Sequence, residues 1–381
     1  MNLPKAPLSI LTTLKESGHS SFIVGGCVRD SLMGITPKDW DIATSATPAE
    51  VKAAFPHTVD TGIAHGTVTV VINRCNYEVT TFRIDGEYLD GRRPEDVTFT
   101  TDLECDLSRR DFTMNAIAFS PETGIVDPFG GENDIRKKSI RCVGEPAARF
   151  TEDALRMMRA IRFSAQLGFS IDPDTFAAIF PIAKRLQMVS AERIRDELTK
   201  TLAGKNPSAL PLLEDTKLLQ FTCDLHQASK WLKALKVKEP AMLYAMLLAD
   251  EDFMRGLKFD NRTIKETALY IRWLPKEIST RYDVKVALND LGPQLFKNLI
   301  ILKKIIGPPP IGLQEICDDI LAKGECFTLK DLAISGSDLL ALGLTGESVG
   351  RSLAAMLDKV MHDPSLNQKE EIIRLVSLSR L

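Results

Sequence analysis

The stretch from Ile23 to Asp41 constrains this chain more than any other, because it places a glycine pair ahead of two aspartates. A short apolar run ends at Gly25 and Gly26, and a helix-compatible segment carrying Arg29 follows. Glycine lets the backbone come close to a ligand, and the N–H groups at the start of a helix bind anions. Arg29, one turn into that helix, is placed to add charged hydrogen bonds to the same anion. The stretch therefore predicts a cradle for phosphate groups.

Two carboxylates one residue apart, Asp39 and Asp41, follow the cradle in a segment (38–42) that we predict as a strand. Alternate residues of a strand point to the same face, so both carboxylates can hold one hard cation or two. Glu78, on a further predicted strand, is a candidate third carboxylate, and a solvent-facing strand glutamate is an equally good interpretation of it. Phosphoryl transfer needs such a cluster, because divalent ions neutralise the triphosphate and activate the attacking hydroxyl. Together these features predict nucleotidyl transfer.

Local patterns predict the other elements of the first part of the chain. They are a helix over 8–18, a helix opened by Thr47, and a hairpin of strands 66–72 and 77–83. A helix over 107–116 is expected to place Asp111 and Asn115 on one face.

The segment 84–106 breaks this regular pattern. It is polar, contains glycine, and carries the charged residues Asp85, Arg92 and Arg93. Such a composition is typical of a mobile loop rather than of a regular element.

From about residue 145 the pattern becomes helical throughout. Apolar residues at helical spacing predict helices over 150–163, 190–197, 210–221, 241–249, 264–274 and 284–304, and Gly307 to Pro310 predicts a linker. The first of these helices carries Asp153 and Arg156 three residues apart, with Thr151 as its expected cap. The ordinary interpretation of the two charges is an ion pair within the helix. Alternatively, an acceptor fixed beside a donor can accept cytosine and adenine and refuse guanine and uracil.

Charge is unevenly distributed along the chain, although its net value is only −3. Residues 1–135 contain 11 Lys and Arg against 20 Asp and Glu, whereas 136–200 contain 13 against 8 and 226–310 contain 15 against 9. The last 71 residues contain 7 against 11. An acidic front and a basic middle suit a metal-binding catalytic part followed by a part that binds a phosphate backbone. Solvated helix faces that differ in charge are the alternative.

Cysteine usage and hydropathy indicate the compartment. The seven cysteines are scattered, which argues against a disulfide framework and a zinc site and fits a reducing cytoplasm. The sequence has no apolar run long enough to span a membrane, and its first residues lack the pattern of a signal peptide. We therefore expect a cytoplasmic protein with no membrane segment and no obligatory protein partner.

These motifs together resemble those of bacterial class II tRNA nucleotidyltransferases, the CCA-adding enzymes, within the polymerase-β-like nucleotidyltransferase superfamily. The resemblance covers the whole chain in the family's order. It rests on the metal motif (Gly25 to Asp30 with Asp39 and Asp41), the ribose motif (Arg109 to Asp111 with Asn115), the hinge motif (Asp127 to Gly131), the base-reading motif (Glu152 to Arg156) and the last neck motif (Ser190 to Glu197).

The resemblance implies an α+β architecture, with an N-terminal nucleotidyltransferase head of mixed β-sheet and helices followed by an all-α neck, body and tail. We expect the catalytic head at 1–143, the neck at 144–204, the body at 205–307 and the tail at 308–381. The body and tail would bind the acceptor stem and elbow of tRNA. The net charge of the last 71 residues leaves the tail's share of that binding open.

The resemblance also assigns roles to the candidate residues. Asp39 and Asp41, with Glu78 as a candidate third ligand, would hold two Mg²⁺ ions while the tRNA 3′ hydroxyl attacks the α-phosphate of CTP or ATP. Gly25, Gly26 and Arg29 would bind phosphates, and Arg110, Asp111 and Asn115 would bind the ribose. Asp153 and Arg156, with Arg159 and Arg162 on the same helix, would read the base, and Asp85, Arg92 and Arg93 would belong to the flexible loop.

Relatives with the same motifs leave alternatives. Poly(A) polymerases usually carry a basic C-terminal extension, which is not seen here, and CC-adding enzymes lack the loop that contains Asp85. A-adding enzymes keep a loop, so the sequence excludes them poorly. A catalytically silent tRNA-binding protein is the non-enzyme alternative, and the presence of both Asp39 and Asp41 argues against it.

Overall fold

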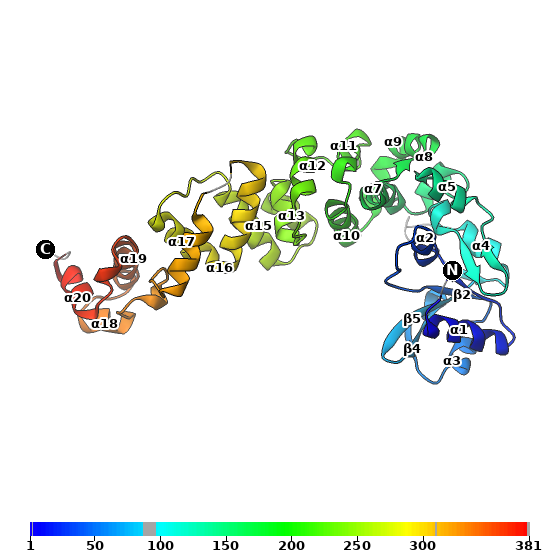
Figure 1. Ribbon diagram of the computed structural model, residues 1–381, viewed down its shortest axis with the longest axis horizontal. Coiled ribbons are helices and arrows are strands. Elements are labelled where there is room, and N and C mark those ends of the chain that lie inside the picture. Colours follow the sequence, from blue (N-terminus) through cyan, green and yellow to red (C-terminus); the bar gives the residue numbers. More distant parts are fainter. Residues whose placement is uncertain (2, 87–96, 309–310, 379–381) are drawn as a thin grey trace. The chain divides into compact units, whose positions relative to one another are not determined.

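A computed structural model describes residues 1–381 except residues 2, 87–96, 309–310 and 379–381 (Figure 1). The chain divides into two compact units, Met1–Lys230 and Trp231–Leu381. The expected division into four domains is finer than this and stays a prediction. Among the described residues, no helix combines the length and the apolar composition needed to cross a membrane.

The first unit begins with a seven-stranded mixed sheet, as predicted. Its strand order is β3-β4-β5-β2-β1-β8-β9, and β2 and β5 form its parallel pair. The strands are β1 (Ser21–Val24), β2 (Ile42–Thr44), β3 (Thr58–Gly62), β4 (Thr67–Ile72), β5 (Cys75–Thr81), β8 (Ala118–Ser120) and β9 (Gly124–Val126). Helices α1 (Lys5–Glu16) and α3 (Pro48–Ala54) contact each other and the sheet (Figure 1). Helix α2 (Gly26–Leu32) follows the end of β1.

Strands β4 and β5 form a hairpin, which confirms the hairpin predicted for residues 66–83, and the local sequence explains its turn. Asn73 and Arg74 form its two-residue turn, and both have positive φ angles, 51° and 64°. Such turns match the twist of the two strands, and asparagine tolerates this conformation well. The predicted capping box at Thr47 is also present, with Glu50 as its partner.

Three predictions for residues 1–116 were wrong. The second strand begins at Ile42, so Asp39 and Asp41 lie in extended chain just before it. The segment 84–106 is not a loop throughout, because β6 (Arg83–Asp85) pairs with β7 (Val97–Phe99) and α4 (Leu103–Ser108) follows. Arg92 and Arg93 lie outside the described residues, and so does the side chain of Asp85.

The third wrong prediction is the helix over 107–116. Helix α4 ends at Ser108, and the chain turns into the 3₁₀ segment η2 (Thr113–Asn115). Between them Phe112 is fully buried in an extended conformation and forms a bridge with Cys142. Pairing with a distant segment therefore overrides the local helical pattern.

Helices and short strands complete the first unit. They are α5 (Gly131–Lys137), β10 (Ser139–Ile140), α6 (Pro146–Glu152), α7 (Leu155–Leu167), β11 (Ser170–Ile171), α8 (Pro173–Ala177), α9 (Ile179–Ile182), α10 (Ala191–Leu202) and α11 (Leu212–Asp215). The helix expected over 150–163 is broken at Asp153, whose carboxylate accepts from the N–H of Leu155, the first residue of α7, at 3.1 Å. Thr151 lies inside α6 and caps nothing; its hydroxyl donates to the Ala147 carbonyl.

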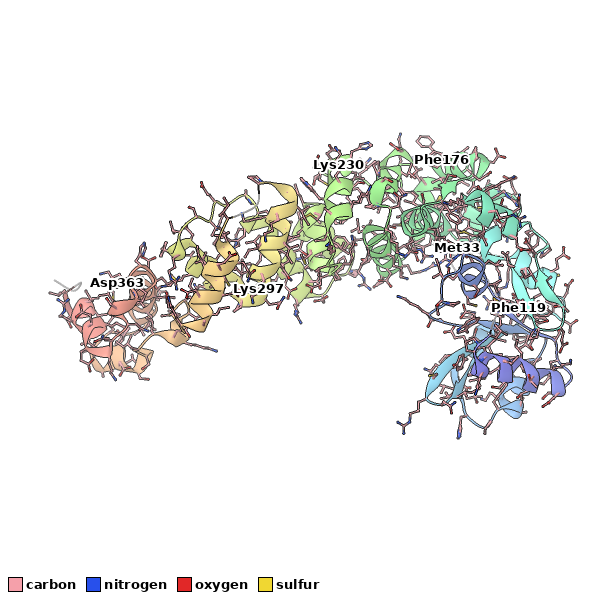
Figure 2. All side chains as sticks on the ribbon, in the orientation of Figure 1. Met33, Phe119, Phe176, Lys230, Lys297 and Asp363 are labelled. Carbon is pink, nitrogen blue, oxygen red and sulfur yellow. The ribbon has the colours of Figure 1, made fainter. Side chains whose placement is uncertain are left out.

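Helix α12 (Leu225–Ala234) leads into the second unit, whose described residues contain helices and no strand. The helices are α13 (Pro240–Met246), α14 (Glu251–Gly256), α15 (Asn261–Trp273), α16 (Arg281–Ile306), α17 (Leu313–Ala322), α18 (Gly336–Ala341), α19 (Glu347–His362) and α20 (Lys369–Leu378). Helix α16 bends at Gly292 and Pro293. Lys297, labelled in Figure 2, pairs with Asp318 of α17 at 3.3 Å.

Candidate active site

A pocket of about 690 Å³ in the first unit brings together most of the residues predicted from the sequence. It is lined by Gly25, Gly26, Arg29, Asp39, Asp41, Arg109, Arg110, Asp111, Asn115, Asp153, Arg156, Arg159, Arg162, Phe163 and Arg193, with Leu155 and Gln166. These residues come from the turn after β1, helix α2, the chain before β2, the segment from the end of α4 through η2, the chain between α6 and α7, and helices α7 and α10. Glu78 and Asp85 are not among them.

Gly25 allows the close approach on one side of this pocket. Its φ angle is +79°, and a Cβ at this position would lie 2.9 Å from Nη1 of Arg110. A side chain here would therefore be strained and would also displace the arginine. Arg29 is buried beyond the turn, where Nη1 donates to Asn115 Oδ1 at 2.7 Å and Nε donates to Asp30 at 2.9 Å.

The two aspartates of the pocket stand apart from the other acids near it. Within the described part of the chain, neither the Asp39 nor the Asp41 carboxylate has a hydrogen-bond or ion-pair partner, and both residues are exposed. The backbone oxygen of Asp41 accepts from the Val24 N–H at 3.0 Å. Partial desolvation raises the pKa of the Asp41 carboxyl, and the negative charge of Glu78 adds to that rise. Two carboxylate groups without a basic partner are the donor set that Mg²⁺ takes in phosphoryl-transfer sites.

Glu78 is next to this pair in the sheet but does not complete a three-ligand cluster. The parallel register pairs Ile42 with Val79, so Asp41 and Glu78 occupy neighbouring positions just before it. Among the residues that the structure describes, no group of three or more histidine, cysteine or acidic side chains is placed to hold a metal. A role for Glu78 as third ligand therefore stays a prediction.

Asp111 is fixed by four donors. Arg159 donates to Oδ2 from Nε at 2.7 Å and pairs with it from Nη2 at 2.6 Å, while Asn115 Nδ2 and the Phe112 N–H donate to Oδ1 at 3.0 and 2.8 Å. Burial alone would raise the pKa of this carboxyl, but Arg159 and the hydrogen bonds from Asn115 and Arg159 lower it to about 2. Asp111 and Asn115 are thus in contact, as predicted, although no helix joins them.

The expected ion pair between Asp153 and Arg156 is not formed, because each residue has another partner. Asp153 Oδ2 accepts from Nη2 of Arg193 at 2.7 Å. Arg156 donates from Nη1 to Glu152 at 2.7 Å and from Nη2 to the backbone oxygen of Arg109 at 2.9 Å. The ordinary interpretation of the two charges was therefore wrong, and both side chains line the pocket.

Arg159 and Arg162 share a buried acid, Glu197 of α10. Nε of Arg162 lies 3.1 Å from Glu197, and Nη1 of Arg159 lies 3.8 Å from it. Burial lowers the pKa of Arg162 to about 10, and the neighbouring Arg159 charge contributes to this. The guanidinium groups of Arg29, Arg159 and Arg162 also lie within 5.4 Å of the Phe163 ring centre. This concentration of positive charge favours an anionic ligand.

Sequence reasoning missed three residues that support the pocket. Asp106 is fully buried and pairs with Arg109 and Arg110, which its spacing of three and four residues on a helix indicates. Arg193 and Glu197 reach residues of α7 that are far away in the sequence, at Asp153 and Arg162. Nothing local in the sequence indicates those two contacts.

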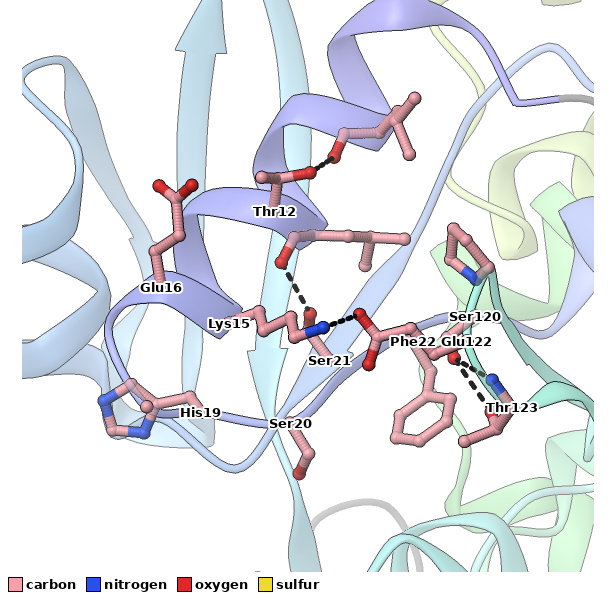
Figure 3. Close-up of a pocket in the computed structure, with 14 residues that line it drawn as sticks. Thr12, Lys15, Glu16, His19, Ser20, Ser21, Phe22, Ser120, Glu122 and Thr123 are labelled. Carbon is pink, nitrogen blue, oxygen red and sulfur yellow. Dashed lines mark hydrogen bonds and ion pairs between the residues drawn. The ribbon is translucent and has the colours of Figure 1, made fainter.

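A second hollow, of about 640 Å³, lies at the opposite end of β1, between α1 and the turn that joins β8 to β9 (Figure 3). Its basic Lys15 pairs with the acidic Glu122, and the two side chains are 62% and 58% exposed. The interaction between two exposed charges of this kind has a free energy of at most about 1 kcal/mol. None of the predicted site residues lines this hollow, so the candidate active site is the arginine-lined pocket.

Comparison with known proteins identifies the family of this chain. Three family models match the chain: the poly(A) polymerase head domain at residues 21–141, a probable RNA- and SrmB-binding site of polymerase A at 168–224, and a putative tRNA nucleotidyltransferase domain 2 at 241–376. The CCA-adding enzyme of Geobacillus thermodenitrificans is 48% identical over 280 residues, covering 70% of this chain and 69% of that protein. That of Anoxybacillus flavithermus is 39% identical over 96% of this chain and 94% of its own length.

A solved structure is similar over the whole length. The CCA-adding enzyme of Bacillus stearothermophilus in complex with CTP has a TM-score of 0.85 and 38% identity, and the match covers 100% of this chain and 98% of that one. A CCA-adding enzyme in complex with ATP, at 21% identity and a TM-score of 0.70, shows the same fold. The predicted architecture of a mixed-sheet head followed by helices is thereby confirmed.

Proposed function

This chain belongs to the family of CCA-adding enzymes, and we propose that it adds C, C and A to the 3′ end of tRNA from CTP and ATP in the cytoplasm. The observation that carries the proposal is one pocket lined both by two carboxylates that have no partner among the described residues and by a set of arginines, each paired with an acid. Such a pocket suits a ligand with a polyphosphate and a base.

In the proposed reaction the 3′ hydroxyl oxygen of tRNA attacks the α-phosphorus of the bound nucleotide. A new P–O bond forms, the bond to the β-phosphate oxygen breaks, and pyrophosphate leaves with the electron pair. Asp39 and Asp41 would hold Mg²⁺, which when bound neutralises the triphosphate and activates the hydroxyl. Gly25 and Gly26 leave room for the phosphates, and the buried Arg29 contributes positive charge beside them.

The ribose is bound from the segment after α4. Arg110 lies against Gly25, and Asn115 is held between Arg29 and Asp111. Because the Asp111 carboxylate already has four donors, its main effect is to orient Asn115 and Arg159 toward the sugar.

Base choice is made by the start of α7. An Asp153 acceptor beside an Arg156 donor complements cytosine and adenine, which present an amino group next to a ring-nitrogen acceptor. Guanine and uracil present a carbonyl next to an N–H, so they would leave both side chains unpaired. Arg159 and Arg162 complete the positive side of the same pocket.

The helical second unit binds the body of tRNA through phosphates. The matched tRNA nucleotidyltransferase domain covers most of it, and exposed lysines such as Lys233, Lys236 and Lys304 are available for such contacts. Lys238 and Lys303 are less available, because Lys238 donates to the Leu232 carbonyl and Lys303 donates to the carbonyls of Leu274 and Lys276.

Incorporation of labelled CTP and ATP into a tRNA transcript that lacks CCA tests this proposal. The wild-type protein should extend the transcript in the presence of Mg²⁺, and Asp41→Ala should abolish extension while tRNA binding is retained. Extension at the wild-type rate by Asp41→Ala would remove the metal assignment. Binding of tRNA without any extension by the wild type would identify a silent tRNA-binding protein instead.

A further inference from the structure

Asp106 is a fully buried acid in α4 that the roles described so far do not use. Its side chain is 1% exposed. Oδ1 accepts from Nε and Nη2 of Arg109 at 3.0 and 2.7 Å, and Oδ2 accepts from Nη2 of Arg110 at 3.1 Å. Burying a carboxylate costs free energy unless the charge is paired. Here Arg109 and Arg110 supply the pairing, and the carboxylate in turn fixes their positions.

Both arginines that it holds line the nucleotide pocket. The Arg110 guanidinium lines the pocket, is 20% exposed, and lies against Gly25. Its hydrogen bond from Nη1 to the Asn115 backbone oxygen is long, at 3.5 Å. The charge of Arg110 also acts on Asp41. Asp106 is therefore the main anchor of Arg110 among the described residues.

The second arginine joins this anchor to the base-reading region. The backbone oxygen of Arg109 accepts from Nη2 of Arg156 at 2.9 Å. Asp106 thus fixes the two residues that follow α4. Arg109 supports the start of α7 through its backbone oxygen, and the Arg110 side chain reaches the pocket beside Gly25.

We propose that Asp106 is a positioning residue for nucleotide binding, which fixes the Arg110 guanidinium beside Gly25, where the proposed sites for the ribose and the phosphates of CTP or ATP meet. The inference rests on the proposed function and adds a residue to it. Asp106 does not touch the nucleotide; it acts through Arg110. Removing its charge should weaken nucleotide binding through a misplaced Arg110 and should leave the bond-forming step nearly unchanged.

A double-mutant cycle on the full-length protein tests this inference, with the KM for CTP and kcat measured on a tRNA transcript that lacks CCA. Asp106→Asn should raise the KM by about tenfold, as expected for loss of a charged hydrogen bond, and should change kcat much less. Arg110→Ala should raise the KM at least as much. If Asp106 acts through Arg110, the double variant should resemble Arg110→Ala to within about twofold.

Asp134→Asn is the matched control, because Asp134 is also buried and pairs with an arginine, Arg141, at 2.8 Å outside the pocket lining. It should lower the melting temperature as Asp106→Asn does and should keep the KM for CTP within about twofold of wild type. The cycle is repeated with Asp106→Glu, which keeps the charge, so that poor folding of Asp106→Asn does not decide the result.

The inference would be overturned if the KM for CTP were unchanged in both Asp106 variants. It would also be overturned if Asp106→Asn raised the KM by the same factor in the Arg110→Ala background as in the wild-type background. Failure of the wild-type protein to extend the transcript would instead contradict the proposed function. The two failures are therefore distinguishable in one set of assays.

Discussion

Replacing Asp111 by asparagine should remove part of the acid sensitivity of the first unit. Arg159 and Asn115 overcome the effect of burial and lower the pKa of the Asp111 carboxyl to about 2, from an ordinary value of 3.8. A group whose pKa is lower in the folded state stabilises the fold above its unfolded pKa, and that stabilisation is lost as the pH falls through the folded pKa. The difference between the two pKa values corresponds to about 2 kcal/mol at neutral pH.

Denaturant unfolding followed by circular dichroism measures this effect. Near pH 6 the free energy of unfolding should be lower in Asp111→Asn than in wild type. At about pH 3 this difference should be smaller by roughly 1 kcal/mol, because at that pH Asp111 is largely protonated in the unfolded state but still largely ionised in the folded state. Asp60→Asn is the control, because Asp60 pairs with Lys52 on the surface and is 51% exposed. Its gap to wild type should stay small at both pH values. A gap between wild type and Asp111→Asn that is the same at both pH values would refute the reasoning.

Three further predictions concern other parts of the pocket and its support. Asp153→Ala or Arg156→Ala should reduce the preference for CTP and ATP over UTP and GTP, and unchanged selectivity in competition assays would remove the base-reading role. Gly131→Ala should destabilise the first unit by more than about 2 kcal/mol, because its Cβ would lie 2.2 Å from the Thr113 carbonyl oxygen; a wild-type melting temperature would contradict this. Removal of Mg²⁺ with a chelator should stop nucleotide incorporation and leave tRNA binding intact in a filter-binding assay, and incorporation that persists would argue against metal dependence.

Elements that depend on local contacts were predicted well. The β4–β5 hairpin follows from a turn in which Asn73 and Arg74 adopt positive φ, and α3 follows from the capping box at Thr47. Asp39 and Asp41 were identified from their spacing because they are near neighbours in the chain, and the other pocket residues were identified largely from the resemblance to the CCA-adding enzymes. The place of the two aspartates before β2 rather than in it did not alter that result.

Elements that depend on distant contacts were not predicted. Phe112 leaves the helical pattern because it pairs with Cys142, and Asp153 interrupts a helix while it pairs with Arg193 on α10. The contact between Asp111 and Arg159 joins residues 48 positions apart. A single sequence contains the charges that form these pairs but does not indicate which charge meets which.

The basic middle of the chain illustrates the same difficulty for function. Several cations counted in the segment 226–310 are neutralised within the fold: Arg281 and the fully buried Lys285 pair with Glu325, and Lys297 pairs with Asp318. The excess of positive charge available to tRNA is therefore smaller than the sequence count suggests. Lysines that are exposed and form no ion pair within the fold are a better guide to phosphate contacts than the net charge of the segment.

The central claim is tested most directly by offering the protein three tRNA transcripts, which lack CCA, end in one C, or end in CC, with CTP and ATP supplied separately and together. The account predicts that CTP alone extends the first transcript by two residues and the second by one. It predicts that ATP alone extends the third transcript by a single residue, and that both nucleotides complete all three. Addition of A alone to the third transcript with no use of CTP, or long tails with ATP, would contradict it.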